Sequence, residues 1–306
     1  MAHLLTEEQW RPLESAHQMR VDVATAAHLS RHQHNQKHPV EDFLFTYYRH
    51  RPGQLRRWDP GAEVILEGAS ERVDWKFYRY SAGAARLDLA AFLEARTDTV
   101  RFVRTLLTAT AARPAQLGCF GLHEWAMVYG QNADTVRHAD WPLRLGAGAT
   151  DEVVESHQLI CSHFDAYRFF TLRARPLNTL APTRDSQTAM EQPGCLHANM
   201  DLYKWAYKLS PAIPSALTMD CFDLAHEIRV MDMRAAPYDL RAIGYEPVKV
   251  ETTEGKATYV AAQRDFASRA QVLRHRLIDA CDAMLSWGGG PKRLSAPAPT
   301  GVASRR

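Results

Sequence analysis

Apolar and polar residues recur along most of the chain with the three-to-four-residue spacing of amphipathic helices. The pattern predicts helices over residues 6–30, 39–48, 87–113, 121–131, 151–170, 197–209, 215–234 and 253–287. The first of these begins with the residues of a capping box, in which Thr6 caps the helix and Gln9 reaches back to it. Its buried stripe is expected to comprise Trp10, Leu13, Val21 and Ala24.

Short stretches of the chain alternate instead with the two-residue period of β-strands. Two of them, residues 63–67 and 74–80, flank an EGAS turn, and a third strand is expected over residues 247–251. We find no internal repeat. The chain is therefore predicted to adopt an α+β fold, predominantly α-helical with a small β-sheet. Residues 1–287 are expected to form a single globular domain, with a helical N-terminal arm over about residues 6–58.

Composition is typical of an ordinary globular protein, with 46% hydrophobic and 24% charged residues among 306. The formal charge of +2 arises in the last nineteen residues, which carry four of the 37 basic residues and no acidic one. This segment, 288–306, is rich in Gly, Pro, Ala and Ser and is predicted to be disordered. The remaining chain has 33 basic residues against 35 acidic ones, which argues against a dedicated nucleic-acid binder.

No run of 18 apolar residues and no signal-peptide pattern is found, so we expect a cytoplasmic protein without a membrane partner. The cysteines show no CxxC spacing, which argues against a disulfide framework and a zinc knuckle. They are expected to be small buried residues: Cys119, Cys161, Cys195, Cys221 and Cys281.

The most basic passage, residues 49–58, interleaves arginines with aromatic residues. Because guanidinium groups match the geometry of phosphate oxygens, this passage is the strongest phosphate-binding candidate. Its candidates are Arg49, Arg51, Arg56 and Arg57. The alternative interpretation is a solvated loop whose arginines pair with Asp59 and Glu63.

His163 and Asp165 form an H-x-D pair, as in iron sites with two histidines and one carboxylate. Within the predicted helix 151–170, however, residues two apart point in different directions. The helical interpretation therefore separates the two side chains and argues against an iron site. It predicts a half-buried His163 on the face of Glu155, Leu159 and Tyr167.

The next two helices each carry polar residues at i, i+4 spacing. His197 and Asp201 face the same way, so the carboxylate could orient the imidazole or both could hold a metal. Asp223 and Glu227 repeat this spacing, with Arg234 further along the same face. Such helices are arranged as in a dimetal carboxylate bundle, although the E-x-x-H step of those proteins is missing.

His123 and Glu124 resemble the start of an H-E-x-x-H zinc motif, but the second histidine is absent. Glu124 in this apolar setting is expected to have a raised pKa, which suits a general acid or base. An ion pair with Arg137 or Arg144 is the structural alternative. The chain lacks the G-x-S-x-G, P-loop and G-x-G-x-x-G motifs, which argues against the corresponding hydrolases, NTPases and dehydrogenases.

Five segments together resemble an actinobacterial family of about 300-residue proteins commonly labelled 3-methyladenine DNA glycosylase. The segments are KHPVEDFLFTYY (37–48), GCFGLHEWAMVY (118–129), CSHFDAYRFFT (161–171), EQPGCLHANMDLYKWA (191–206) and DMRAAPYDL (232–240). The resemblance covers nearly the whole chain up to residue 287. It implies an N-glycosylase that acts on alkylated purines in DNA, without a cofactor.

A glycosylase flips the damaged base, stacks it on aromatic rings and stabilises a cationic sugar with a carboxylate. On this hypothesis the candidate catalytic residues are Glu124, Asp201, Asp165, His197 and His163. The substrate-binding candidates are Trp125, Tyr167, Arg168, Tyr203, Trp205 and Arg234, and the four arginines of the basic passage would bind phosphates.

The rival hypothesis is a metal-dependent enzyme that uses iron, manganese or zinc and acts on a small molecule. Its ligand candidates are His163, His197, Asp201, Asp223 and Glu227. The substrate pocket would lie between helices, lined by Phe164, Phe169 and Tyr203. A non-catalytic protein that binds a ligand in the same pocket is the third possibility.

Overall fold

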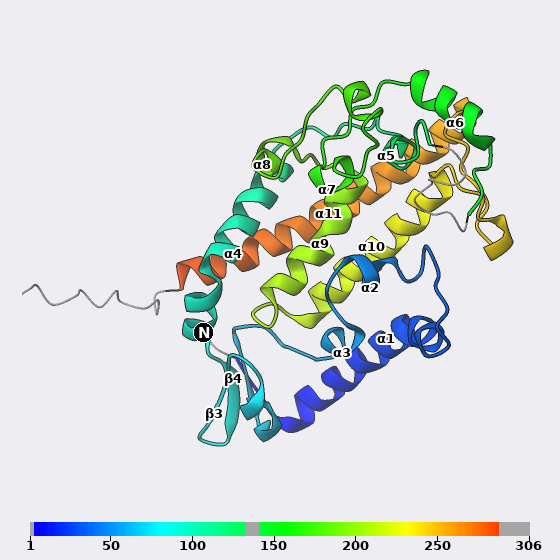
Figure 1. The fold of residues 1–306 in the computed structure, drawn as a ribbon. Helices are drawn as coiled ribbons and strands as arrows, with labels where there is room; N and C mark the ends of the chain where they lie inside the picture. The colour runs from blue at the N-terminus through cyan, green and yellow to red at the C-terminus, as the bar shows by residue number, and fades with distance from the viewer. Residues whose placement is uncertain (1–2, 132–140, 288–306) are drawn as a thin grey trace, which may run out of the picture.

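The computed structural model describes residues 3–131 and 141–287, and it has an α+β fold that is mostly helical, as predicted (Figure 1). Four long helices form one packed group in which α9 contacts the other three. They are α4 (Leu89–Ala111), α9 (Leu196–Leu209), α10 (Ser215–Ala235) and α11 (Thr253–Ser286). The predicted disordered tail, 288–306, lies outside the described residues. No helix in the described ranges is both long and apolar enough to cross a membrane.

Helix α1 (Glu7–Gln33) begins where the capping box predicts, because the backbone N–H of Thr6 donates to Oε1 of Gln9 at 2.9 Å. Its buried stripe differs from the predicted one. Leu13 is exposed, and the buried positions are Trp10, His17, Val21 and Thr25. Ala24 is partly buried. Because α1 packs on α3 (Pro52–Leu55), β2 (Val64–Glu67) and α10 rather than on one flat surface, its apolar periodicity alone does not identify the buried face.

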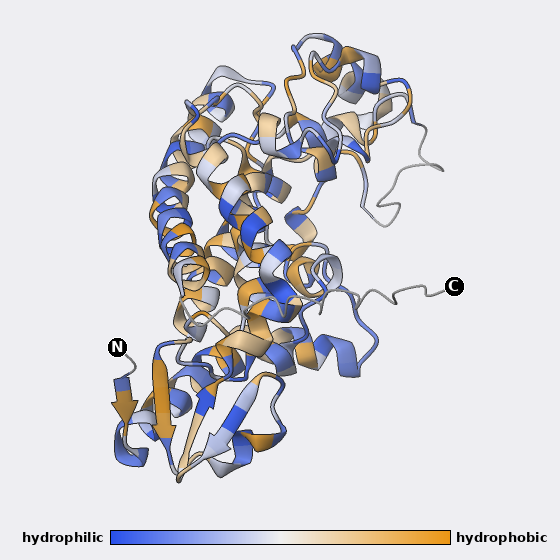
Figure 2. Ribbon diagram, turned by 90° about the vertical axis from the view of Figure 1, so that its left-hand side faces the viewer, coloured by the Kyte–Doolittle hydropathy of each residue, from blue (hydrophilic) through white to orange (hydrophobic). Residues whose placement is uncertain are grey.

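A four-stranded sheet lies at one end of the helices, as Figure 2 shows. Its order is β1-β2-β4-β3, with β1 (His3–Leu5) parallel to β2 (Val64–Glu67) and the other neighbours antiparallel. The predicted strand 63–67 is confirmed as β2. The predicted strand 74–80 is largely wrong, because a 3-10 helix, η1 (Ser70–Asp74), precedes the hairpin of β3 (Tyr78–Ser81) and β4 (Ala84–Leu87).

The predicted third strand, 247–251, is wrong. Val248 and Val250 are buried, which explains the alternating pattern, but the segment forms no ladder with the sheet. The backbone N–H of Val248 donates instead to the carbonyl of Arg234 at 2.7 Å. The backbone of this segment then packs closely against the first turn of α11. A Cβ on Gly255 would lie 1.8 Å from the carbonyl oxygen of Lys249.

The predicted helix 151–170 is also wrong. Helix α6 (Gly146–Glu155) ends early, and a loop leads to the single turn α7 (Phe164–Tyr167). Asn178 stabilises this loop, because its side chain accepts from the backbone N–H of Cys161 and donates to the Cys161 carbonyl. These side-chain bonds satisfy backbone groups that a continuous helix would otherwise pair.

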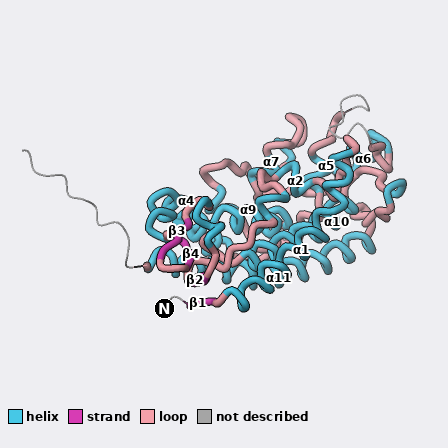
Figure 3. Tube along the Cα trace, turned by 90° about the horizontal axis from the view of Figure 1, so that it is seen from below, coloured by secondary structure: helices cyan, strands magenta, loops and turns pink. Residues whose placement is uncertain are grey.

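The remaining described helices are short, and Figure 3 shows α6 and α7 toward the end of the bundle away from the sheet. Two of them shorten predicted helices: α2 (Phe43–Tyr47) within 39–48, and α5 (Leu122–Ala126) within 121–131. The others are α8 (Gln187–Met190), η2 (Arg175–Leu177) and η3 (Arg241–Ile243). One hydrophobic cluster runs through the described chain, from Trp10 in α1 to Met284 in α11.

Candidate metal centre

A buried triad of ligand-type side chains forms where α7, α8 and α9 meet. His163 directly precedes α7, Glu191 directly follows α8, and Asp201 lies in the middle of α9. The Nε2 atom of His163 lies 3.4 Å from Oε1 of Glu191 and 3.4 Å from Oδ2 of Asp201. All three side chains are almost completely buried. We call this set the first triad.

The ring of His163 has no hydrogen-bond partner at either nitrogen among the described residues, although both atoms are buried. Its two 3.4 Å contacts are too long for hydrogen bonds to a carboxylate. Ligand atoms that each lie about 2.0–2.1 Å from a tetrahedral metal are about 3.4 Å apart. Both distances from His163 therefore fit neighbouring ligands of one ion better than hydrogen bonds, and the third ligand pair lies within 4.8 Å.

A second triad lies beside the first and joins α5, α9 and α10. It consists of His123, His197 and Asp232, whose ligand atoms all lie within 4.8 Å of one another. Nε2 of His123 is 2.9 Å from Oδ1 of Asp232, yet both atoms lack a partner in hydrogen-bond geometry. Two histidines and one carboxylate are the donor set of many iron and zinc sites.

The two triads are neighbours because His197 lies between their other histidines. Its ring centre is 4.4 Å from that of His123 and 5.4 Å from that of His163. A charged pair borders the second triad, since Nη1 of Arg229 lies 3.2 Å from Glu124 and 3.3 Å from Asp232. Six ligand-type side chains thus form one continuous buried polar region.

Burial and neighbouring charges set the protonation of this region. Burial would raise the pKa of Asp201, but Lys204 and His163 hold that pKa well below its usual range. Burial and the neighbouring His123 lower the pKa of His197, so its ring is neutral at pH 7 and has a free lone pair. Burial would lower the pKa of His163 and His123, but their carboxylate neighbours raise it, so these two rings would lose a proton when a metal binds. Asp201 and His197 already have the ionised and neutral forms that bind metals.

Other side chains orient the first triad from outside. The hydroxyl of Tyr48 donates to Oδ1 of Asp201 at 2.8 Å, and the ammonium of Lys204 lies 2.8 Å from its Oδ2. Nε2 of Gln187 donates to Oε1 of Glu191 at 2.6 Å. Hydrogen bonds of this kind hold ligand carboxylates in one rotamer around metal sites.

Two small cavities border the triads. One of about 80 Å³ touches His197 and is lined by Glu124, Arg229 and apolar side chains, among them Phe43 and Phe169. The other, of about 10 Å³, lies against His123 and His197 and has room for about one water molecule. Space for a bound water or a molecule of a few atoms is therefore present next to the histidines.

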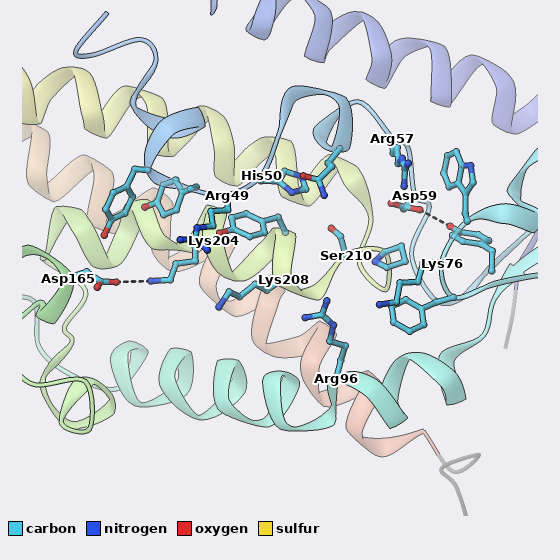
Figure 4. Close-up of a pocket in the computed structure, with 18 of the residues that line it drawn as sticks. Arg49, His50, Arg57, Asp59, Lys76, Arg96, Asp165, Lys204, Lys208 and Ser210 are labelled. Carbon is cyan, nitrogen blue, oxygen red and sulfur yellow. Dashed lines mark hydrogen bonds and ion pairs between the residues drawn. The ribbon is translucent and has the colours of Figure 1, made fainter. Parts of the chain in front are cut away.

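A large groove runs along α9 on the other side of Lys204 and Tyr48 (Figure 4). We call it the basic groove. Its volume is about 820 Å³, and it is lined by eight cationic side chains and two carboxylates. The cations are Arg49, Arg57, Lys76, Arg96, Arg168, Arg184, Lys204 and Lys208, and the carboxylates are Asp59 and Asp165.

The five ligands predicted from the sequence do not all converge. His163 and Asp201 belong to the first triad and His197 to the second, whereas Asp223 and Glu227 are about half exposed and pair with Arg20 and Arg269. The sequence interpretation missed Glu191 and Asp232 and considered His123 only for a zinc motif. Ligands spaced as H-x-x-x-H or E-x-x-H on one helix can be recognised in a sequence. Glu191, His123 and Asp232 instead come from separate elements, so no such motif marks them.

The predicted carboxylates of a glycosylase lie in different surroundings. Asp165 lines the basic groove and pairs with Lys204 and Arg168, so it does not join His163. Glu124 is buried and pairs with Arg229. The alternative that paired it with Arg144 is wrong, because Arg144 pairs with Glu251. Arg137 lies outside the described residues.

Most predicted base-stacking residues are buried. Trp125 is completely buried and its indole N–H donates to the carbonyl of Ala235. Tyr203 and Trp205 are also buried, whereas Tyr167 is partly exposed. The substrate-binding candidate Arg234 donates to the carbonyl of Glu246.

The predicted phosphate-binding arginines separate into two groups. Arg49 and Arg57 line the basic groove. Arg56 pairs with Asp22 at the surface, and Arg51 is exposed outside the groove lining. The pocket predicted from Phe164, Phe169 and Tyr203 is not formed by these three together, since among them only Phe169 lines the cavity beside His197.

Comparison of the chain with protein-family models, curated proteins and solved structures returns no match.

Proposed function

We propose that this protein is a metal-dependent enzyme that binds a first-row divalent metal at each of its two buried triads and acts on a small molecule. The observation that carries the proposal is His163, whose two buried nitrogens lack hydrogen-bond partners among the described residues. Its Nε2 is equally distant from Glu191 and Asp201. Leaving such a group buried and unpaired costs about 1–3 kcal/mol, and an ion bound to Nε2 would remove that cost for this nitrogen.

The donor sets support iron, manganese or zinc. Each triad supplies only imidazole and carboxylate groups, and three protein ligands leave further positions for water or substrate. A bound ion would polarise a substrate oxygen and lower the pKa of a bound water. The cavity of about 80 Å³ beside His197 offers space for a substrate of a few atoms, and Glu124 with Arg229 could hold a polar group there.

Metal analysis of the purified protein tests this proposal directly. We expect up to two equivalents of iron, manganese or zinc per chain, recovered when the chelated protein is reloaded. Glu191→Gln should remove the equivalent bound by the first triad and Asp232→Asn that of the second. Asp223→Asn is the matched control, because Asp223 lies at the surface in an ion pair with Arg20 and should leave the metal content unchanged.

Circular dichroism of each variant establishes that the loss of metal does not reflect unfolding. A folded wild-type protein that binds no metal above background after reloading would refute the proposal. Equal loss in the Asp223→Asn control would refute the assignment to these triads.

A DNA N-glycosylase is the second candidate, supported by the family resemblance and by the excess of cations in the basic groove. Of its predicted carboxylates Glu124, Asp165 and Asp201, Asp165 lines that groove. Release of methylated adenine from alkylated DNA by the chelated protein measures this activity. We expect Asp165→Asn to abolish it and Glu124→Gln to leave most of it, whereas no release by the wild type excludes the activity.

A further inference from the structure

The basic groove holds more positive charge than its own acids can neutralise. Its two carboxylates already have partners, since Asp165 pairs with Lys204 and Arg168, and Asp59 accepts from the hydroxyl of Tyr78. Six other cations of the lining form no ion pair with any carboxylate of the described chain. They are Arg49, Arg57, Lys76, Arg96, Arg184 and Lys208.

Three of these cations come from separate elements and gather at one part of the groove. Lys208 lies near the end of α9, Arg96 on α4 and Arg184 in the loop before α8. Figure 4 shows Lys208 and Arg96 extending into the same space. Burial lowers the pKa of Lys208, and Lys204, Arg96 and Arg184 lower it further. The fold thus keeps like charges close together, which a bound anion would stabilise.

The aromatic rings of the groove are already in contact with other groups. His50 and Tyr207 stack on each other with ring centres 4.8 Å apart. The guanidinium of Arg57 lies over Trp75 and the ammonium of Lys76 over Phe77. Proteins that bind single-stranded nucleic acid without sequence preference present free ring faces to the bases. The groove therefore favours recognition of phosphate groups over recognition of bases.

We propose that the basic groove is a binding site for a small molecule that carries two or more phosphate groups. One group binds to Lys208, Arg96 and Arg184, and a second to Arg57 and Lys76. The volume of about 820 Å³ lies in the range of small-molecule sites. This site goes beyond the metal centre and does not require it, although Lys204 contacts both.

Isothermal titration of the full chain with inorganic tripolyphosphate at low salt tests the site. We expect binding, with orthophosphate at least roughly tenfold weaker because it engages a single group of cations. Lys208→Ala and Arg96→Ala should each weaken tripolyphosphate binding roughly tenfold or more. Neither variant should lower the melting temperature, because each removes a repelling charge rather than an ion pair.

Two controls separate this site from general charge attraction and from the metal centre. Arg101 lies on α4 like Arg96, is exposed, has no carboxylate partner among the described residues and does not line the groove, so Arg101→Ala should retain binding. Glu191→Gln should also retain it. Failure of tripolyphosphate to bind, or an equal loss in Arg101→Ala, would overturn the proposal. A twelve-nucleotide DNA strand that binds more tightly than tripolyphosphate through Lys208 and Arg96 would also overturn it.

Discussion

The ammonium nitrogen of Lys204 lies 2.8 Å from Oδ2 of Asp201, and this ion pair forms the wall between the basic groove and the first triad. The same ammonium reaches Asp165 in the groove at 3.1 Å. Both acid groups are mostly buried, so the pair is weakly screened by solvent. Lys204 therefore competes with a cation for Asp201 and contributes positive charge to the groove.

Lys204→Met should strengthen metal binding at the first triad and weaken tripolyphosphate binding in the groove. Without the ammonium, Asp201 has its full charge available for an ion, and we expect the metal affinity to rise roughly tenfold. Competition with a chromophoric chelator measures this affinity. Lys37→Met, at an exposed position outside both sites, should change neither affinity. A metal affinity that stays constant or falls in a folded Lys204→Met protein contradicts the competition.

Arg72→Ala should destabilise the fold by about 3–5 kcal/mol. The Arg72 guanidinium is completely buried, donates to the carbonyl of Trp58 and pairs with Glu14 at 2.9 Å. The Cζ atom of this guanidinium also lies 4.4 Å from the ring centre of Trp75. Removing it leaves Glu14 without its closest partner and opens a cavity between the aromatic rings. Urea unfolding at pH 7 measures the change.

Arg72→Lys should also be destabilising, because an ammonium cannot donate in the forked geometry of a guanidinium. The control is Arg11→Ala, since Arg11 contacts Glu14 and the ring of Trp10 from the solvent side. Arg11→Ala should change the free energy of unfolding by no more than about 0.5 kcal/mol. Similar unfolding free energies for the Arg72 and Arg11 variants would show that burial of Arg72 contributes little.

Gly255→Ala and Gly148→Ala should have opposite effects, although both glycines are the third residue of a helix. A Cβ at Gly255 would lie 1.8 Å from the carbonyl oxygen of Lys249, and backbone must move to admit it. We expect Gly255→Ala to lower the free energy of unfolding by about 3 kcal/mol. A Cβ at Gly148 meets no atom within 4 Å, so alanine there should stabilise α6 by about 0.5 kcal/mol. Thermal melts measure both, and a tolerated Gly255→Ala would contradict the close contact.

Glu41→Gln should remove part of the acid sensitivity of the fold. Glu41 accepts hydrogen bonds from His226 and Tyr245, and chiefly the first lowers its pKa from 4.5 to about 2. A carboxyl group whose pKa is lower in the folded state than in the unfolded state stabilises the fold at pH values above its unfolded-state pKa. That contribution is present above pH 4.5 and is lost as the pH falls toward 2. Because the side chains of Glu41 and His226 are both about one-third exposed, we expect this contribution to the free energy of unfolding to be about 1 kcal/mol.

Urea unfolding at pH 5.5 and pH 2.5 measures this contribution. The free energies of unfolding of the wild type and Glu41→Gln should differ at pH 5.5 and differ much less at pH 2.5. Glu8→Gln is the control, because Glu8 is exposed and makes no ion pair with any described residue. A difference between wild type and Glu41→Gln that is the same at both pH values would refute the assigned pKa.

Local patterns predicted the regular elements well where one face of a helix packs on neighbours and the other faces solvent. The start of α1 at Thr6 follows from two side chains three residues apart, and the bounds of α9 and α10 follow from periodicity within one segment. The predicted strand 247–251 failed because burial under a helix produces the same alternation as a sheet face. The predicted helix 151–170 failed because the side chain of Asn178, outside the segment, stabilises a loop.

By itself the sequence determined the helical class of the fold and strand β2, and it singled out His163, His197 and Asp201, which lie in the two buried triads. Only the tertiary structure decided which side chains meet. Glu191 and Asp201 approach His163 from separate elements, and Asp232 reaches His123 from more than 100 residues away. The same packing leaves Asp223 and Glu227 at the surface despite their helical spacing. Spacing along a chain specifies neighbours on one helix, whereas convergence of several elements depends on packing that no local pattern encodes.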